Sequence, residues 1–401
     1  MRLPSDGDSS GRNLGAEELE LVRQVLETGT LWSVRGTYVS RLEKEFAARH
    51  GMKHAFACTS GTAAVHLAVA ALNPEPGDEI VTTPITDMGA LTPILYQGAI
   101  PVFCDVDPDS YCVTAETIEP RLTKRTKAVI VTHLFGIPCD MGPIMELCRK
   151  RNIPVIEDCA QAFDATYDGQ AVGTFGSISC FSFQQGKHMT TGEGGMVMTN
   201  DANLARRMYL SINKAWGYGD PKPDHYFLAL NYRMNEVTAA VGIAQLGKLT
   251  DVVRNRRVSA ARFAKKIAGI PGVTPQKAYE NSSPVYWKFC VNIDEHRVPL
   301  NDIAAKMKEN GIFAAPRYIG KPAFECQVFR DQVTLGNSRW PYSDRARENA
   351  TPPDHDRKNF PGTMKALSQV LVIPWNEFYT NEHVDYIADN LRKAARGGQE
   401  S

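Results

Sequence analysis

The first 200 residues alternate short apolar runs with stretches of helical periodicity, and this alternation limits the possible folds more than any other feature. Strands that are apolar along their whole length are buried on both faces, as in parallel sheets whose connections are helices. We therefore predict an α/β domain with a mostly parallel sheet between helical layers. The expected strands are 54–58, 79–83, 100–104, 128–132, 154–157, 178–183 and 196–199.

The pattern changes after a long helix that we predict from about residue 235 to 257. Beyond it we expect a strand at 286–293 and helices at 300–310 and 382–393, which indicate a second, smaller domain. The segment 324–361 is rich in Pro, Asn, Asp and Arg, and we predict a long irregular insertion there. The predicted division is a flexible N-terminal arm, a large domain and a small C-terminal domain, at residues 1–13, 14–252 and 253–401.

Composition excludes several classes of protein. Lysine plus arginine and aspartate plus glutamate each number 45, so nothing favours binding to nucleic acid or an anionic membrane. The nine cysteines and nine histidines show no metal-ligand spacing, and we expect free thiols in a reducing compartment, the cytoplasm. The N-terminal residues lack the apolar core of a signal peptide, and no apolar run approaches the roughly 18 residues of a membrane span.

The segment Thr59-Ser60-Gly61-Thr62 lies between the first expected strand and a helix rich in Ala, Leu and Val. A helix start presents unpaired N–H groups and the positive end of the helix dipole, which together suit a phosphate. Glycine allows a close approach, and the hydroxyl groups can add hydrogen bonds. An ordinary capped helix start has the same residues, so this segment alone leaves both interpretations open.

Two further segments carry candidate chemistry. VIEDCAQAF at 155–163 places Asp158 at the end of an expected strand and Gln161 three residues later, where parallel sheets bind ligands. CFSFQQGKHMTTGEGGMVMTN at 180–200 places Lys187 on a glycine-rich loop between two expected strands. A lysine with a depressed pKa can attack a carbonyl cofactor. Taken singly, the acid could be a solvated helix cap and the lysine an ordinary surface residue.

Together the three segments place a phosphate cradle, a carboxylate and a lysine at strand ends of one sheet. Pyridoxal phosphate needs these groups: an anchor for its phosphate, an acid for its pyridine nitrogen, and a lysine that forms a Schiff base with its aldehyde. We therefore predict pyridoxal phosphate as the cofactor and Lys187 as the Schiff-base residue.

The sequence resembles the DegT/DnrJ/StrS family of sugar aminotransferases, which have pyridoxal-phosphate fold type I, and within it the aminocyclitol and keto-sugar branch. The motifs that carry the resemblance are LGAEELELVRQVLETG, TSGTAAVHLAVAAL, PGDEIVTTP, GAIPVFCDVD, VIEDCAQAF, SFQQGKHMTTGEGG and NYRMNEVTAAVGIAQLGKL. The resemblance implies a seven-stranded sheet in the large domain and an α+β C-terminal domain. It also implies transfer of an amino group from glutamate or glutamine to a keto-sugar or keto-cyclitol, free or nucleotide- or nucleoside-linked, in antibiotic or other natural-product biosynthesis.

The resemblance assigns roles to individual residues. Lys187 would hold the cofactor and move the proton, Asp158 would pair with the pyridinium nitrogen, and Gln161 would contact the ring hydroxyl region. Asn231 would reach the phosphate of the partner subunit's cofactor, which implies a homodimer with active sites at its interface. The residues that would hold the phosphate in their own subunit are Ser60, Gly61, Thr62 and Ser182.

The substrate half of the site departs from the family pattern. Met88 takes the place of an aromatic residue that stacks on the cofactor ring, and we expect its thioether to pack there. Phe163 and Asp164 replace a frequent His-Gly pair. Weaker candidates for contacts with the substrate, the donor carboxylate or a neighbouring site are Trp32, Arg35, His225, Tyr226, Arg317 and Tyr318.

Two other functions remain open at this stage. A pyridoxal-phosphate sugar or nucleoside dehydratase would keep the cofactor, and one dehydratase branch of the family replaces the lysine with histidine. Here Lys187 is present and His188 follows it. A non-catalytic, cofactor-binding regulator would be favoured by a fused DNA-binding module, and the sequence has none.

Overall fold

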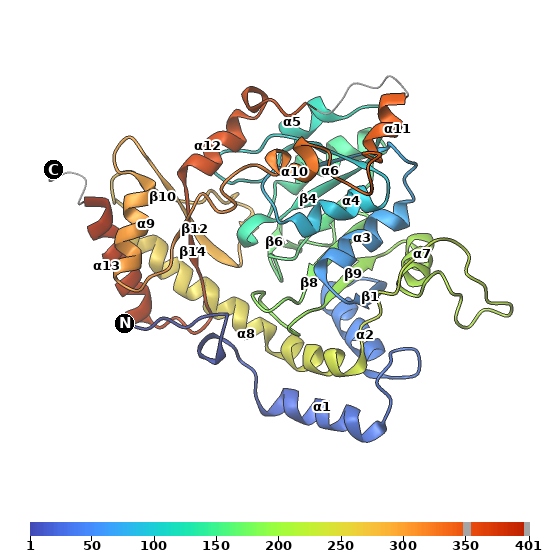
Figure 1. The fold of residues 1–401 in the computed structure, drawn as a ribbon. Helices are drawn as coiled ribbons and strands as arrows, with labels where there is room; N and C mark the ends of the chain where they lie inside the picture. Colours follow the sequence, from blue (N-terminus) through green and yellow to red (C-terminus); the bar gives the residue numbers. More distant parts are fainter. Residues whose placement is uncertain (348–353, 397–401) are drawn as a thin grey trace.

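The computed structural model describes residues 1–347 and 354–396, and a seven-stranded sheet forms its centre (Figure 1). The strand order is β1-β9-β8-β5-β4-β2-β3; β9 is antiparallel to both of its neighbours, and the other pairs are parallel. The mostly parallel α/β sheet is therefore confirmed. The strands are β1 His54–Cys58, β2 Glu79–Thr82, β3 Ile100–Phe103, β4 Thr126–Thr132, β5 Val155–Asp158, β8 Ile178–Ser182 and β9 Gly195–Thr199.

Helices cover both faces of this sheet, which explains why its strands are apolar throughout. Along β4, Ala128 and Ile130 pack in a cluster with residues of α3 (Gly61–Leu72), whereas Val129 and Val131 pack in a cluster with residues of α6 (Met141–Lys150). All four side chains are fully buried. Successive side chains of a strand point to opposite faces, so a strand covered on both sides cannot alternate apolar and polar residues.

The helix α8 (Glu236–Ile267) connects the two parts of the molecule, as Figure 1 shows. Its N-cap Asn235 accepts a hydrogen bond from the Thr238 N–H (2.8 Å), so it begins where we predicted but runs ten residues further. Its first half packs on α1 (Ala16–Thr28) and α2 (Tyr38–His50), and its second half on α13 (Asn381–Arg396). The predicted end at residue 257 followed from the basic residues there. The helix continues because Ala260, Phe263 and Ile267 extend its buried face.

The predicted limit between residues 252 and 253 thus falls inside one continuous helix, and the division into domains stays a prediction. Among the described residues no helix, the long α8 included, combines the length and apolar character needed to cross a membrane.

The C-terminal part is an α+β layer built on an antiparallel sheet of order β10-β12-β14-β13. Its core joins Phe263 of α8, Phe289 of β12, Trp375 after β14 and Leu391 of α13. Its elements are β10 Val273–Pro275, β12 Lys288–Ile293, α9 Leu300–Glu309, β13 Ala315–Pro316, α12 Pro361–Gln369 and β14 Val370–Pro374. A small third sheet contains β6 Thr166–Tyr167, β7 Gln170–Ala171 and β11 Ser282–Ser283.

The segment 324–361, predicted as irregular, contains short helices in its described part; residues 348–353 lie outside the described residues. Phe324, Phe329 and Tyr342 pack with Phe103 of β3, so aromatic burial orders this segment at the edge of the large sheet. The short helices here are η5 Ala323–Glu325, α10 Gln327–Arg330, α11 Tyr342–Arg347 and η6 Arg357–Asn359. Those elsewhere are η1 Ser9–Gly11, η2 Met88–Ala90, α4 Thr92–Tyr96, α5 Ala115–Ile118, η3 Glu119–Arg121, η4 Leu134–Gly136 and α7 Ala202–Ile212.

A buried arginine, Arg256 of α8, ties several segments together. Its guanidinium contacts the Glu377 carboxylate (Nη2–Oε2 2.7 Å) and donates to the backbone carbonyl of Trp287 (3.1 Å). It also lies 3.4 Å from the carboxylate of Asp6, in the N-terminal segment predicted as a flexible arm. The side chain is completely buried, so its charge depends on these partners.

We expect Arg256→Met to lower the free energy of unfolding by about 3–5 kcal/mol, because it leaves the buried Glu377 carboxylate without its cation. Urea unfolding followed by circular dichroism measures this loss. The matched control is Arg254→Met on the same helix: Arg254 is exposed and pairs with Asp251, so a change within about 0.5 kcal/mol is expected. Equal effects of the two substitutions would contradict the prediction.

Candidate active site

A cavity of about 390 Å³ opens at the edge of the large sheet where β1, β5 and β8 end. These three strands run in one direction, so their carboxyl ends meet at this edge. Two predicted site residues, Met88 and Asn231, do not line the cavity. The predicted residues that line it are Ser60, Gly61, Thr62, Asp158, Gln161, Ser182 and Lys187.

The N-terminus of α3 forms one wall of the cavity. Ser60 caps the helix by accepting a hydrogen bond from the Ala63 N–H (3.0 Å). The N–H groups that precede Ala63 in the first turn have no carbonyl partner within the helix. A Cβ on Gly61 would lie 2.6 Å from the Cβ of Ser182, so glycine is needed for the end of β8 to approach the helix. The hydroxyls of Ser60, Thr62 and Ser182 and these N–H groups fit a phosphate group.

Asp158 lies at the end of β5, buried, with 6% of its surface exposed. Its carboxylate accepts a hydrogen bond from the Ala160 N–H (3.1 Å). Burial raises the pKa of Asp158, although the nearby charges of Lys187 and His133 act in the opposite direction. A buried carboxylate with so few partners fits a protonated ring nitrogen, because that cation would stabilise its ionised form.

Lys187 reaches the cavity from the loop between β8 and β9. Its Nζ lies 4.1 Å from the ring centroid of Trp287, a residue of the C-terminal part. Burial lowers the pKa of Lys187 to about 8; Asp158 and Asp87 oppose this shift, and Lys288 adds to it. A free amine is therefore accessible near neutral pH, which the reaction of a lysine with a carbonyl group requires.

The backbone around Lys187 is folded into tight turns. The Lys187 N–H donates to the Gln184 carbonyl (2.9 Å), and the Gln185 N–H donates to the Gly192 carbonyl (2.9 Å). Gly192 has a φ of +81°, and a Cβ on Gly195 would lie 2.4 Å from the Ser60 carbonyl oxygen. The glycines predicted from the sequence thus serve these turns and bring β9 close to the helix start.

Gln161 is buried beside the cavity, and its Oε1 accepts a hydrogen bond from the Phe135 N–H (2.7 Å). The Phe135 ring in turn contacts Trp287 and Tyr318, with centroid distances of 6.4 and 4.7 Å. The hydrogen bond from Phe135 holds the amide of Gln161 at one wall of the cavity. The predicted contact of Gln161 with the ring hydroxyl would be made from this wall.

The structure differs from the prediction for Met88. Its side chain packs against an apolar cluster that includes Leu91 and Phe103, and it does not line the cavity. Its neighbour Asp87 lines the cavity, is exposed, and accepts a hydrogen bond from the Gly89 N–H (2.8 Å). The apolar side chain of Met88 packs with the core, so the cavity is lined here by the carboxylate of Asp87.

Of the weaker candidates, Tyr318 lies beside the cavity wall against Phe135. The others make contacts elsewhere. Arg317 donates to Asn301 and Glu295 (both 2.8 Å), His225 contacts the Lys214 carbonyl (2.7 Å), and Tyr226 donates to Asp220 (2.8 Å). The guanidinium of Arg35 lies 5.9 Å from the Trp32 ring. Sequence reasoning missed Asp87, Glu193 and Trp287, which line the cavity. Glu193 lies in the glycine-rich motif around Lys187, where no role was assigned to it. Asp87 and Trp287 lie outside the motifs, and Trp287 enters from a distant part of the chain.

A buried group of possible metal ligands lies behind Asp158. One ligand atom each of His133, Glu157 and Cys159 lies within 4.8 Å of the others. The Glu157 oxygens, however, accept hydrogen bonds from His133 Nε2 and from the N–H groups of Gly173, Phe175 and Gly176, at 2.6–3.2 Å. These bonds occupy the carboxylate lone pairs, so the group fastens the turn before β8 to the end of β5.

The fold and the cavity together define a pyridoxal-phosphate enzyme of fold type I. The cavity combines a helix start fit for a phosphate, a buried carboxylate fit for a ring nitrogen, and a lysine with a lowered pKa. More particularly, the chain belongs to the DegT/DnrJ/EryC1/StrS aminotransferase family, whose model matches residues 12–355. It is a sugar aminotransferase with pyridoxal phosphate as its cofactor, as predicted.

Curated relatives and solved structures support this assignment. GDP-perosamine synthase of Escherichia coli O157:H7 is 36% identical over 74% of this chain and 81% of its own. UDP-N-acetyl-3-dehydro-α-D-glucosamine 3-aminotransferase of Acidithiobacillus ferrooxidans is 40% identical over 75% and 79%. L-glutamine:2-deoxy-scyllo-inosose aminotransferase of Streptomyces fradiae is 34% identical over 79% of each chain. The aminotransferase TlmJ of Streptoalloteichus hindustanus superposes with a TM-score of 0.83, at 28% identity, over 96% and 98%.

The lowered pKa of Lys187 predicts how cofactor-free protein captures free pyridoxal phosphate. The neutral amine condenses with the aldehyde and releases water, so the capture rate rises roughly tenfold per pH unit below about pH 8 and levels off above it. Absorbance of the lysine–cofactor bond, followed after mixing at each pH, measures the rate.

Lys187→Ala removes this absorbance, whereas Lys150→Ala, which changes an exposed lysine paired with Glu146, leaves the profile unchanged. A midpoint near the ordinary lysine value of 10.5 would show that the amine is not desolvated in the cavity.

Proposed function

We propose that this enzyme moves an amino group from L-glutamate or L-glutamine to the ketone of a keto-sugar or keto-cyclitol in the biosynthesis of an antibiotic or another natural product. The observation that carries the proposal is the position of the Lys187 amine, in one cavity with Asp158 and the N-terminus of α3. The relative named for L-glutamine and 2-deoxy-scyllo-inosose supports the donor and a cyclitol substrate. Those named for GDP- and UDP-sugars support a nucleotide-linked substrate.

The described residues take roles around the cofactor. When bound, pyridoxal phosphate supplies an aldehyde that captures amines and a ring that delocalises an electron pair. Lys187 would hold the cofactor, and its Nζ would move a proton away from the substrate carbon and later return it. Asp158 keeps the ring nitrogen protonated, and Gln161 contacts the ring hydroxyl. The phosphate is held by Ser60, Gly61, Thr62 and Ser182.

The charges around the cavity support a hydroxyl-rich substrate. Asp87, Asp158 and Glu193 contribute carboxylates, and Lys187 is the cation among the lining residues that the structure describes. The exposed carboxylates of Asp87 and Glu193 accept hydrogen bonds but donate none, which suits the hydroxyl groups of a sugar or cyclitol.

We also propose a homodimer in which Asn231 reaches the partner's cofactor phosphate. Asn231 is exposed and outside the cavity of its own chain. It lies in a segment whose apolar side chains are open to solvent in the single chain: Leu228 is 98% exposed and Leu230 54%. With Tyr226, these leucines gather exposed apolar surface in one short segment, as is typical of a protein interface. The nine free cysteines, eight of them buried, support a reducing compartment, the cytoplasm.

The first test is the donor half-reaction. With L-glutamate or L-glutamine alone, we expect the lysine–cofactor absorbance to disappear while about one equivalent of the corresponding 2-oxo acid forms per cofactor, as ping-pong transfer requires. Absorbance and chromatography of the 2-oxo acid measure the two events. The dehydratase alternative predicts loss of water from the sugar without net amination. No conversion by either amino acid would contradict the proposed donor.

The second test addresses the shared active site. Loss of a hydrogen bond to a phosphate predicts that Asn231→Ala weakens cofactor binding by roughly 10- to 100-fold. When Asn231→Ala and Lys187→Ala chains are mixed at equal amounts and refolded together, we expect about a quarter of the wild-type activity at limiting cofactor, because half of the dimers then hold one intact site. The matched control is a mixture of wild type with Lys187→Ala. No recovery above Asn231→Ala alone would place Asn231 outside the partner's site.

A further inference from the structure

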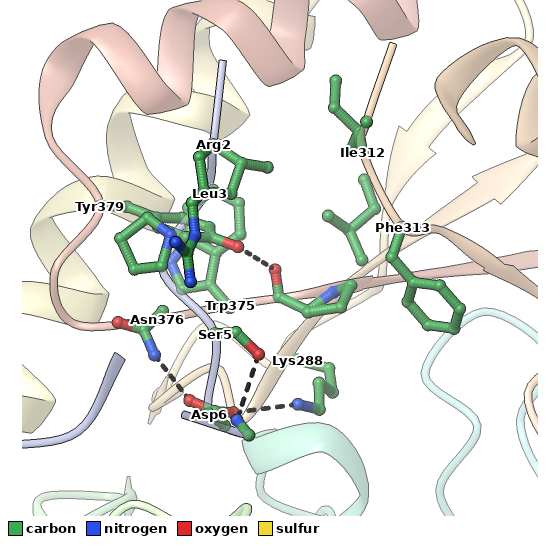
Figure 2. Close-up of a pocket in the computed structure, with 15 residues that line it drawn as sticks. Arg2, Leu3, Ser5, Asp6, Lys288, Ile312, Phe313, Trp375, Asn376 and Tyr379 are labelled. Atoms are coloured by element: carbon green, nitrogen blue, oxygen red, sulfur yellow. Dashed lines mark hydrogen bonds and ion pairs between the residues drawn. The ribbon is translucent and has the colours of Figure 1, made fainter. Parts of the chain in front are cut away.

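The N-terminal segment, residues 1–13, lies against the C-terminal part at one largely buried acid, Asp6, whose side chain is 12% exposed (Figure 2). Asp6 accepts a hydrogen bond from Asn376 Nδ2 (2.6 Å) and pairs with Lys288 Nζ (3.2 Å), both drawn as dashed lines in Figure 2. It also pairs with Arg256 Nη2 (3.4 Å) and lies 3.6 Å from Arg12 Nη2. These three cations lower the pKa of Asp6 although its burial acts in the opposite direction. Asp6 is thus an ionised acid shared by three cations.

The same segment contacts the backbone of the loop that carries Lys187. Arg12, whose side chain is 3% exposed, donates from Nη1 to the carbonyl oxygen of Lys187 itself (2.8 Å). Its Nε donates to the Asp6 carbonyl (3.2 Å), and Gln185 Nε2 donates to that same carbonyl (2.9 Å). The segment therefore holds the loop at two positions, Gln185 and Lys187.

The residue between these two positions is held from the other side. The indole Nε1 of Trp287 donates to the Gly186 carbonyl (2.6 Å), and the Lys187 amine lies over the same indole ring. Three consecutive residues, 185–187, are thus each bound by a group from outside their loop. Fixing the carbonyl groups of Gly186 and Lys187 fixes the direction in which the Lys187 side chain leaves the chain, since χ angles are counted from the backbone.

The turn in the N-terminal segment is tightly packed. A Cβ on Gly11 would lie 2.4 Å from the Ser5 carbonyl oxygen and 2.7 Å from Asn376 Nδ2. The Gly11 carbonyl accepts a second hydrogen bond from Asn376 Nδ2 (3.1 Å). Packing as close as this holds Asp6 and Arg12 together, six residues apart, so the acid can orient the guanidinium that reaches the Lys187 loop.

We propose that the N-terminal segment positions the catalytic lysine: Asp6 anchors it to the C-terminal part, and Arg12 holds the Lys187 carbonyl. The inference rests on the proposed role of Lys187. Asp6 and Arg12 are positioning residues, since they act on the lysine through its backbone. The segment thereby links the C-terminal part, through Asn376 and Lys288, to the loop that holds the cofactor.

Substitutions of Arg12 test the proposal by rapid mixing of cofactor-free protein with free pyridoxal phosphate. If Arg12 orients the Lys187 amine, Arg12→Ala leaves the amine less well directed. We therefore expect the lysine–cofactor absorbance to form roughly 10- to 100-fold more slowly at saturating cofactor. It also predicts a changed visible circular-dichroism band of the bound cofactor, which reports the orientation of the ring. Arg12→Lys keeps a donor for the carbonyl and restores part of the rate.

Asp6→Asn is the second variant, because it keeps the shape of the anchor and removes its charge. The matched control is Asp8→Asn, which changes an exposed acid of the same segment that caps η1 through the Ser10 N–H (2.8 Å). We expect slower capture in Asp6→Asn, although less than in Arg12→Ala, and the wild-type rate in Asp8→Asn.

The outcomes separate this inference from the proposed function. If Lys187→Ala keeps the absorbance, the proposed role of the lysine fails. If Lys187→Ala loses it while folded Arg12→Ala and Asp6→Asn capture the cofactor at the wild-type rate with an unchanged dichroism band, only the positioning role is overturned. A loss of thermal stability without a change in rate or band overturns it as well, because the segment would then serve folding alone.

Discussion

The Lys187 amine and the Asp158 carboxylate face one cavity, and burial acts on both in the direction of neutrality. It lowers the pKa of the lysine and raises that of the aspartate, while their mutual attraction opposes both shifts. Two groups of opposite type at one sheet edge, each with its charged form disfavoured by burial, are suited to a cofactor that offers an aldehyde to the amine and a ring nitrogen to the acid. The strand order makes this meeting possible, because β5 and β8 are neighbours and end at the same edge.

The C-terminal part contributes residues to the surroundings of Lys187. Trp287 lies beneath the Lys187 amine and binds the neighbouring carbonyl, and Arg256 binds the Trp287 carbonyl from inside α8. The buried charge of Arg256 and the largely buried charges of Lys288 and Asp6 hold this wall in place, and each would be costly to bury alone. The environment of the lysine therefore depends on segments at both ends of the chain.

Several expectations from the sequence were confirmed because they depend on local order. The apolar runs are buried strands, the residues at 60–62 start a helix, and Asp158 and Ser182 stand at strand ends. The predicted end of α8 and the expected position of Met88 differ from the structure, because both depend on packing partners that lie far away in the sequence. The helix α8 continues past its basic residues because Phe263 and Ile267 meet a second core, and Met88 follows the core and leaves Asp87 at the cavity.

The sequence by itself determined the class of fold and the cofactor, and it predicted groups that share one cavity, because strand periodicity, helix starts and the spacing around Lys187 are written in contiguous residues. Only the tertiary structure decided what surrounds the lysine: the indole of Trp287, the carboxylate of Asp87, and the contact of Arg12 with the Lys187 carbonyl. Arg12 and Trp287 lie 175 and 100 positions from the lysine, and the desolvation that shifts its pKa is a property of packed neighbours. No short motif can encode such distances, since packing brings these groups together only after the strands and helices have formed.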